Sequence, residues 1–186
     1  MELPDAITSI FQHETEDDKP MHQEDIAKLG DISSTVDRLM IHIGLNSGIA
    51  IEELLGIRKA DIDSKAQTIK IWDKKKKRER IAYIPKWLSV ELGKYILNMD
   101  ASVDFIFLMS DNTANKRIAE WTERLIGHRK TWLAIRRTYI TRCASEKSYV
   151  PILLASENSG IPIDSIMAYY AKTPDEKRQI VNGVKK

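Results

Sequence analysis

The chain has 186 residues, of which 42% are hydrophobic and 30% are charged, as is typical of a single globular domain with its own core. Its apolar runs are too short to span a bilayer and no basic-then-apolar leader opens it, so we expect a cytoplasmic protein without a membrane partner. The single cysteine, Cys143, excludes an internal disulfide and fits a packed thiol in a reducing compartment.

Charge is distributed unevenly along a chain whose net charge is only +2. Residues 1–34 hold nine acidic side chains against two lysines. Residues 74–80 read Lys-Lys-Lys-Lys-Arg-Glu-Arg, and residues 116–147 hold nine basic side chains against three acidic ones. Two basic clusters on a nearly neutral chain favour a surface for nucleic acid over two merely solvated faces. We interpret residues 1–18 as an acidic arm or linker remnant, and residues 19–186 as the folded domain with its C-terminal tail.

The first part of the domain predicts helices. An apolar face with helical spacing is formed by Val36, Leu39, Met40 and Ile43. We expect Ser33 or Ser34 to cap this helix and the stretch 44–48 to end it. Residues 24–29 indicate a short helix before it, and residues 51–55 begin another helix after it.

A basic β-hairpin follows. Residues 61–63 form a strand stub, residues 68–72 alternate as a strand does, and residues 80–85 form a second strand. The lysine-rich run between them is then the turn, although no Asn-Gly or Asp-Gly fixes its register. Because two or three antiparallel strands are not stable alone, we predict a mainly α fold whose helices cover a small antiparallel hairpin or three-stranded sheet.

Helical patterns fill most of the remaining chain. The predicted helices cover residues 88–96, 118–125, 131–145, 150–156, 163–170 and 175–181, and residues 105–108 form a buried extended segment or a turn of helix. Pro162 is well placed to start the last core helix. Its predicted inward stripe consists of Ile163, Ile166, Met167 and Tyr170.

The segment 131–142 combines a buried stripe with two arginines. Trp132, Ile135 and Tyr139 recur at helical spacing, and Arg136 and Arg137 lie beside them. A guanidinium held at the edge of a core helix can grip a phosphate through two parallel hydrogen bonds. A basic surface helix with two solvated arginines is the alternative interpretation.

Three motifs, with the basic hairpin between the first two, resemble the catalytic domain of the tyrosine recombinases, the phage integrase family. Residues 46–62 are similar to the family's Thr-Gly-x-Arg-x-x-Glu-Leu-x-x-Leu motif, which runs into an Asp-Ile strand. The positions that match are Gly48, Glu53, Leu54, Ile57 and Asp61. Residues 136–141 are similar to Arg-His-Thr-Phe-Ala-Thr, and residues 169–174 to the nucleophile motif Tyr-Ala-His-Pro. The resemblance covers residues 19–180.

The resemblance implies a site-specific DNA recombinase, or integrase, that cuts and rejoins double-stranded DNA through a 3′-phosphotyrosine. Arginines would neutralise the phosphate charge and a hairpin lysine would protonate the leaving oxygen, without a metal or any other cofactor. A homo-oligomer on DNA, a tetramer, is also implied. Carried over by position, the catalytic roles fall on Tyr170, Arg136, Glu53, Lys75 and, after it, Lys77. The basic clusters assign DNA contacts to Lys74, Lys76, Arg78, Arg129, Lys130 and Arg137.

Three positions depart from the family's pattern. The first arginine falls on Ala50, the histidine of His-x-x-Arg falls on Leu133, and the histidine of the third motif falls on Ile161. Losing one arginine at a phosphoryl-transfer centre should cost about 2–4 kcal/mol of transition-state stabilisation. A catalytically inactive recombinase-fold protein that only binds DNA is therefore our second hypothesis. A helix-turn-helix regulator built on residues 48–62 is the third.

Two tyrosines compete for the role of nucleophile. Tyr170 keeps the order Tyr-Ala-Lys and aligns Gly160 with the glycine of the third motif. Tyr169 gives a better match for Ser165 and Ile163 upstream. We place Tyr170 first and keep Tyr169 as the alternative, and either tyrosine could instead be a packed aromatic on a core helix.

Overall fold

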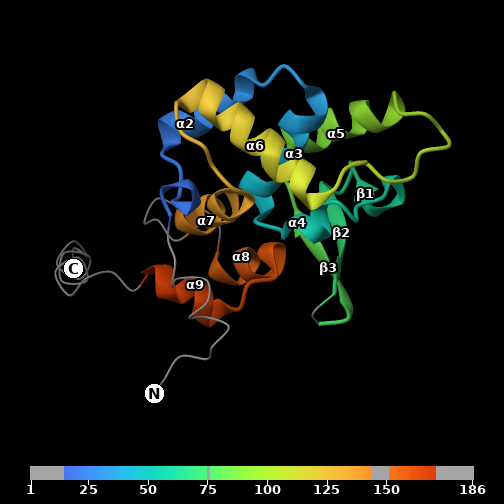
Figure 1. Ribbon diagram of the computed structural model, residues 1–186. Coiled ribbons are helices and arrows are strands. Elements are labelled where there is room, and N and C mark those ends of the chain that lie inside the picture. Colours follow the sequence, from blue (N-terminus) through green and yellow to red (C-terminus); the bar gives the residue numbers. More distant parts are fainter. Residues whose placement is uncertain (1–14, 75, 144–150, 171–186) are drawn as a thin grey trace.

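The computed structural model describes residues 15–74, 76–143 and 151–170, with side chains up to Met167 in the last helix (Figure 1). Lys75 and the helix predicted at 175–181 lie outside these ranges. Within them, no helix combines the length and the apolar character that crossing a membrane requires.

Most of the described chain is helical. The helices are η1 (Glu16–Asp18), α2 (Gln23–Lys28), η2 (Leu29–Asp31), α3 (Thr35–Ser47), α4 (Ile51–Leu54), η3 (Lys59–Asp61), α5 (Lys86–Leu97), α6 (Asp111–Ile126), α7 (Trp132–Cys143), α8 (Ile152–Ser159) and α9 (Ile163–Tyr170). The strands β1 (Ile62–Asp63), β2 (Thr68–Asp73) and β3 (Arg78–Tyr83) form one antiparallel sheet in that order. The prediction of a mainly α fold with a small antiparallel sheet is confirmed.

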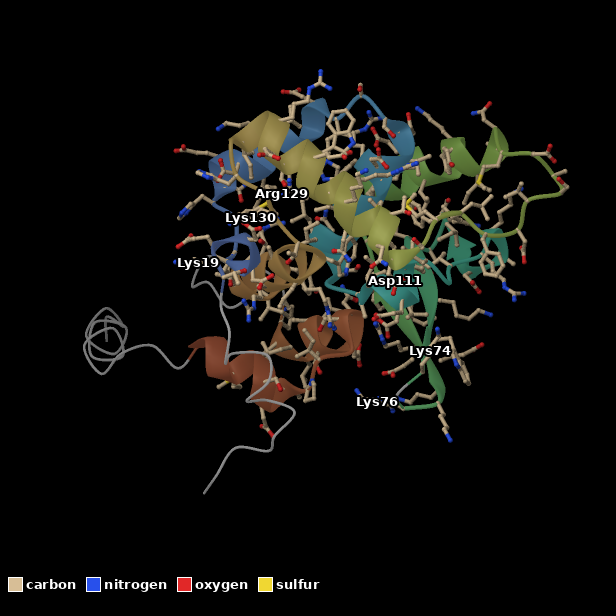
Figure 2. All side chains as sticks on the ribbon, viewed as in Figure 1. Lys19, Lys74, Lys76, Asp111, Arg129 and Lys130 are labelled. Carbon is tan, nitrogen blue, oxygen red and sulfur yellow. The ribbon has the colours of Figure 1, made fainter. Side chains whose placement is uncertain are left out.

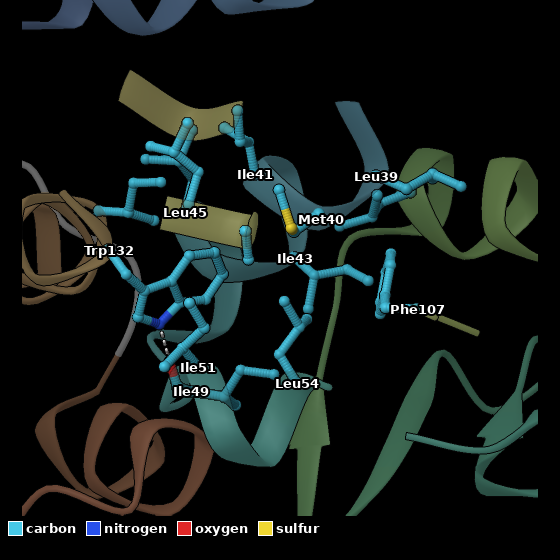
Figure 3. Packing of buried hydrophobic residues seen from close by; sticks show 14 of the residues in the cluster. Leu39, Met40, Ile41, Ile43, Leu45, Ile49, Ile51, Leu54, Phe107 and Trp132 are labelled. Carbon is cyan, nitrogen blue, oxygen red and sulfur yellow. Dashed lines mark hydrogen bonds between the residues drawn. The ribbon is translucent and has the colours of Figure 1, made fainter. Parts of the chain in front are cut away.

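Helix α3 is the centre of the domain and packs against α5, α6, α7 and α8. It begins where the Ser34 hydroxyl accepts the N–H of Asp37 at 3.3 Å, one of the two caps that the sequence suggested. It ends at Gly48, whose φ of 65° is a left-handed conformation that glycine adopts without strain. Leu39 and Ile43 of its apolar face are fully buried (Figure 3).

The prediction that the stretch 44–48 ends this helix is wrong at its start, because α3 continues past Gly44. This glycine serves helix packing. A Cβ atom at residue 44 would lie 2.6 Å from the Trp132 ring and 2.7 Å from the Ile135 side chain, so α7 approaches α3 more closely than any other residue type would allow. The Trp132 indole N–H also donates to the Ile49 carbonyl at 2.9 Å, which joins the start of α7 to the end of α3 (Figure 3).

Strands β2 and β3 form the predicted hairpin, and its register pairs Asp73 with Arg78. Asp73 closes the turn between the strands, since its Oδ1 accepts the Lys76 N–H at 3.0 Å, and Lys77 adopts a φ of 49°. The buried inner face of the sheet includes Ile69, Ile71 and Ala82. The tip of the hairpin projects beyond the helices (Figure 1).

The described part of the predicted acidic arm, residues 15–18, packs against the start of α7. The Thr131 N–H donates to the Asp17 carbonyl at 3.1 Å, and Lys130 Nζ donates to the Glu16 carbonyl at 2.6 Å. These bonds join the entry of the domain to the helix that carries the second motif.

Helix α9 is packed less deeply than predicted. Ser165 and Ile166 are buried, but Ile163 and Met167 of the predicted inward stripe are 38% and 48% exposed. The prediction is therefore wrong at these two positions. Helix α9 packs on the short helix α8 and on α7, and among these four residues only the narrow face of Ser165 and Ile166 is buried.

The helix-turn-helix hypothesis is not supported by the geometry of residues 48–62. The helix that would read DNA there is α4, a single turn whose apolar residues Ile51 and Leu54 are buried. A recognition helix needs several exposed turns to lie in a major groove. Residues 48–62 therefore have no such element.

Candidate active site and nucleic-acid interface

Three basic side chains from different elements converge on the carbonyls of residues 157–160, which are the last three residues of α8 and the glycine that follows it. Arg80 of β3 donates through Nη1 to the first two of these carbonyls, at 3.1 Å to the first. Arg136 of α7 donates through Nη2 to the third at 3.1 Å, and Lys76 of the hairpin turn donates through Nζ to the fourth at 3.2 Å. Carbonyls at the end of a helix carry partial negative charge, so they gather cations at one place.

Arg136 is the arginine of the second motif, and both ends of its guanidinium group are held. Besides the bond to α8, its Nε donates to the Gly48 carbonyl at 2.7 Å. A Cβ atom at residue 48 would lie 2.3 Å from the Tyr139 ring, so only glycine fits between α3 and α7 there. Arg136 is thereby fixed between the end of α3 and the end of α8, as a residue that orients a phosphate must be.

Ala50, which the sequence resemblance aligns with the family's first arginine, lies directly before α4 and is half-buried. Its N–H donates to Oε2 of Glu53 at 2.8 Å, and Arg80 Nη2 donates to the same oxygen at 2.6 Å. The side chains of Arg80 and Glu53 are only 8% and 11% exposed. Sequence reasoning named Glu53 but missed Arg80. Arg80 is two residues before the buried Ala82, and residues two apart in a strand point to the same face, so this spacing would have placed Arg80 on the inner face of β3.

The hairpin carries most of the accessible positive charge beside this site. Its exposed basic residues are Lys74, Lys76, Lys77 and Arg78. Lys76 also forms an ion pair with Asp73 at 3.9 Å. Lys75, the first candidate for the general acid, lies outside the described residues. The hairpin therefore presents a basic ridge that leads to the end of α8.

The second predicted set of DNA contacts lies elsewhere. In Figure 2, Arg129 and Lys130 are far from Lys74 and Lys76. Arg129 is exposed and forms an ion pair with Glu123 at 3.3 Å. Arg129 and Lys130 therefore do not form one continuous patch with the hairpin lysines, whereas Arg136 of the same sequence cluster binds a carbonyl next to the one that Lys76 binds.

Two residues of the second set are buried. Lys130 is 8% exposed and donates to the Glu16 carbonyl, and Arg137 is 3% exposed and donates to the Asp18 carbonyl at 3.1 Å. The prediction that Lys130 and Arg137 contact DNA is contradicted by this burial, because their charged groups bind the backbone of η1. The charge pattern alone did not distinguish cations that bind the chain itself from cations that face solvent.

The remaining sequence candidates lie on α7, directly after α8 and at the end of α9. Leu133 and Ile161, at the two histidine positions, are both half-buried. Tyr169 and Tyr170 are the last two residues of α9, and their side chains lie outside the described part of the chain. Helix α9 packs on α7 and α8, the two helices that supply Arg136 and its carbonyl partner.

Asn158 is a functional-site neighbour that sequence reasoning missed. Its side-chain amide bonds both backbone groups of Tyr83 and also donates to the Tyr139 hydroxyl at 3.3 Å. Burial raises the pKa of Tyr139 far above its usual value, and Cys143 adds to the increase, so this phenol stays neutral. The neutral Tyr139 hydroxyl accepts the hydrogen bond from Asn158 and in this way supports α8.

The described ranges contain no cluster of side chains that could bind a metal ion. There, no three His, Cys, Asp or Glu side chains come together as a metal site would require.

Comparisons with known proteins point in one direction. The sequence model of the phage integrase family matches residues 19–148. Among solved structures, XerA recombinase superposes with a TM-score of 0.74 at 17% identity over 90% of this chain and 65% of its own. XerH recombinase, solved with its difH substrate in a pre-cleavage complex, gives a TM-score of 0.69 at 14% identity over 90% of this chain and 55% of its own.

The integrase of the transposon Tn1549, solved with circular intermediate DNA, gives a TM-score of 0.72 at 19% identity over 96% of this chain and 71% of its own. No curated protein sequence matches the chain significantly. The chain thus spans between about half and two thirds of the XerH and XerA chains. These structures share the fold, and the family match covers the first two motifs and the hairpin between them. The chain belongs to the phage integrase family.

Proposed function

We propose that the chain is the catalytic domain of a site-specific DNA recombinase that cuts and rejoins DNA through a 3′-phosphotyrosine. The observation that supports this most is the convergence of Arg136, Arg80 and Lys76 on the end of α8. The next helix, α9, ends in the two candidate nucleophiles. A phosphodiester bound by these cations would lie beside the helix that carries the attacking group.

In the proposed reaction, the Tyr170 oxygen attacks the phosphorus and gives up its proton, and the bond to the 5′ oxygen breaks. Arg136 stabilises the charge on a non-bridging oxygen, and Glu53 positions Arg80 beside it. A hairpin lysine protonates the leaving oxygen, with Lys75 as first candidate and Lys77 as second. The phosphotyrosine ester that links the cut DNA strand to the protein conserves the energy of the broken bond. A second 5′ hydroxyl can therefore attack this ester and rejoin the strand.

The choice of Tyr170 over Tyr169 rests on sequence spacing. Tyr170 keeps the order Tyr-Ala-Lys of the nucleophile motif and aligns Gly160 with the glycine of the third motif. Tyr169 remains the alternative, because it gives the better match for Ser165 and Ile163 upstream.

Double-stranded DNA is the proposed substrate. XerH and the Tn1549 integrase, whose fold this chain shares, were solved with DNA substrates. Lys74, Lys76, Lys77 and Arg78 on the hairpin are the proposed contacts to the phosphate backbone, with Arg129 as a more distant contact. Assembly as a homotetramer on a pair of target sites, in the cytoplasm, belongs to the same proposal.

A covalent-capture assay tests the proposal. The protein is incubated with nicked duplexes whose target region is randomised, so that the cut strand loses its 5′-hydroxyl fragment and the adduct is trapped. We expect a slow-migrating band on a denaturing gel for the parent chain and for Tyr169→Phe, and no band for Tyr170→Phe. A band that persists when both tyrosines are phenylalanine would contradict the proposal.

A non-cutting DNA-binding protein is the second candidate function. The apolar residues Ala50, Leu133 and Ile161 at three catalytic positions of the family favour it. It predicts binding to duplex DNA that weakens as salt rises, with no band from the parent chain at any sequence in the randomised pool. The same assay therefore separates the two candidates.

A further inference from the structure

Arg80 lies where the chain lacks the arginine of the first motif. Its Nη2 and the backbone N–H of Ala50 donate to one and the same oxygen, Oε2 of Glu53. A single acceptor atom therefore separates the guanidinium of Arg80 from the residue that replaces the arginine. The guanidinium of Arg80 comes from β3 and lies on the other side of Glu53 from Ala50.

Arg80 also shares its second anchor with the arginine of the second motif. Arg80 and Arg136 donate to successive carbonyls at the end of α8. Two guanidinium groups are thus held side by side by the same helix end, although they come from a strand and a helix. Paired guanidinium groups suit the two non-bridging oxygens of a phosphodiester.

One donor of Arg80 is left open. The Arg80 side chain is only 8% exposed, and its buried Nε has no hydrogen-bond partner. This Nε lies against Gly160, where a Cβ atom would be 3.0 Å away. Buried N–H groups are rarely left without an acceptor, so an open one beside a candidate phosphate site points to a ligand oxygen.

We infer that Arg80 is the second phosphate-binding arginine of this site and that its Nε–H donates to a non-bridging oxygen of the scissile phosphate. This inference rests on the proposed function. Glu53 and the α8 carbonyls hold the guanidinium in place before DNA binds. Arg80 thereby fulfils, from β3, the role that the family assigns to the position of Ala50.

The alternative is that Arg80 only joins β3 to α4 and α8, as its ion pair with Glu53 would do in any case. The phosphate-binding role and the purely structural role differ in one respect: only in the first does the effect of Arg80 on the reaction rate depend on the negative charge of the substrate. A phosphate-binding arginine matters because the phosphate is charged in the transition state. A purely structural arginine matters equally for charged and uncharged substrates.

The test measures single-turnover adduct formation by the parent chain and Arg80→Lys, on a captured target sequence. Two nicked duplexes are compared, one with the natural phosphodiester and one with a methylphosphonate, in which a methyl group replaces a charged oxygen at the cut site. Arg38→Lys is the matched control. Arg38 also donates to a carbonyl, that of Ile32 at 2.8 Å, and lies near Glu91 at 3.9 Å, but at the opposite end of α3.

We expect Arg80→Lys to slow adduct formation on the phosphodiester by about 100-fold, and Arg38→Lys by no more than about twofold. On the methylphosphonate, the rates of Arg80→Lys and the parent should come within about threefold of each other. Equal rates on the phosphodiester would overturn the inference. An equal loss on both substrates would also overturn it, because it would show a structural role.

A second variant keeps the test decisive if circular dichroism shows that Arg80→Lys is not folded. If Arg80 already fulfils the missing role, Ala50→Arg should raise the parent's rate by no more than about threefold. A gain of about 100-fold or more would show that the role is vacant and would overturn the inference. If the parent chain gives no adduct at all, the proposed function fails, and the inference fails with it.

Discussion

Asn158 hydrogen-bonds both backbone groups of Tyr83: its Oδ1 accepts the Tyr83 N–H at 2.8 Å, and its Nδ2 donates to the Tyr83 carbonyl at 3.0 Å. The side chain thus takes the place of a neighbouring strand at the free edge of β3. It fixes α8, whose last carbonyls bind Arg80 and Arg136, to the strand that carries Arg80. The geometry of the site therefore depends on a residue that is not expected to touch DNA.

Asn158→Asp tests this dependence. The carboxylate can still accept the Tyr83 N–H, but it cannot donate to the Tyr83 carbonyl or to Tyr139. We expect the free energy of unfolding to fall by about 2 kcal/mol, because a buried acceptor loses its donor. Urea denaturation measures this value, with Asn98→Asp as control because the Asn98 amide donates to the Lys94 carbonyl at an exposed site. Equal losses in both variants would show that the paired bonds to Tyr83 contribute little.

Glu53→Gln should destabilise the domain, because it leaves the buried guanidinium of Arg80 without its counter-ion. We expect a loss of about 3 kcal/mol in the free energy of unfolding, since breaking one partner of a buried pair leaves an uncompensated charge. The exposed neighbour Glu52 provides the matched control, Glu52→Gln, which should change stability by less than about 0.5 kcal/mol. Guanidinium denaturation of the two variants compares them directly. A loss below about 1 kcal/mol in Glu53→Gln would mean that the pair is not stabilising.

Gly44→Ala should disturb the contact between α3 and α7. The added methyl group would lie 2.6 Å from the Trp132 ring, which must then shift, and overpacking of this kind costs about 1–3 kcal/mol. Gly30→Ala is the control, because a Cβ atom there meets nothing within 4 Å. Thermal unfolding should show a lower melting temperature only for Gly44→Ala. A melting temperature equal to that of the parent would show that the two helices can separate slightly without cost.

His42 should make stability depend on pH. Burial is the main cause that lowers the pKa of His42 from its usual 6.5, partly opposed by Glu91, so the folded protein binds a proton at this site less readily than the unfolded chain. The free energy of unfolding should therefore fall as the pH decreases below about 6.5.

The measurement is a series of urea denaturation curves between pH 7.5 and 5.5, a window of about one pH unit on either side of the normal histidine pKa. His42→Gln should flatten this dependence, and His128→Gln, at an exposed position, should not. A parent slope that survives in His42→Gln would assign the effect to other groups.

Hairpin lysines should contribute to DNA affinity mainly through electrostatics. Each neutralised phosphate contact contributes about 0.9 to the slope of log K against log salt, so Lys74→Gln and Lys77→Gln should each reduce the slope by about that amount. Lys94→Gln, exposed on α5, is the control and should leave the slope unchanged. Fluorescence anisotropy with a labelled duplex at several salt concentrations gives the slopes. Unchanged slopes in both hairpin variants would place the DNA contact elsewhere.

Periodic features of the fold could be predicted from the sequence. The buried faces of α3 and α7 were visible because apolar residues recur at helical spacing, and the hairpin was visible because the strands alternate. Gly44 was misread for a physical reason. A glycine that ends a helix and a glycine that admits a neighbouring helix look alike in sequence, and Trp132, which needs the space, is far away along the chain.

The site could be predicted only in part, for a similar reason. The motifs led to Glu53, Ala50 and Arg136, but the pairing of Arg80 with Glu53 joins residues that are far apart in sequence. The burial of Lys130 and Arg137 was likewise invisible, because a basic residue that binds backbone carbonyls has the same spacing as one that faces solvent. Charge patterns therefore indicate which residues are basic, and tertiary contacts decide which of them can reach DNA.

The central claim is that a tyrosine at the end of α9 becomes covalently linked to DNA beside these arginines. The most direct measurement is mass spectrometry of the trapped adduct after nuclease and protease digestion. The account predicts a peptide that carries a nucleotide 3′-phosphate on Tyr170. A nucleotide on a residue other than the two tyrosines, or intact DNA recovered from a parent chain that binds it tightly, would contradict the account.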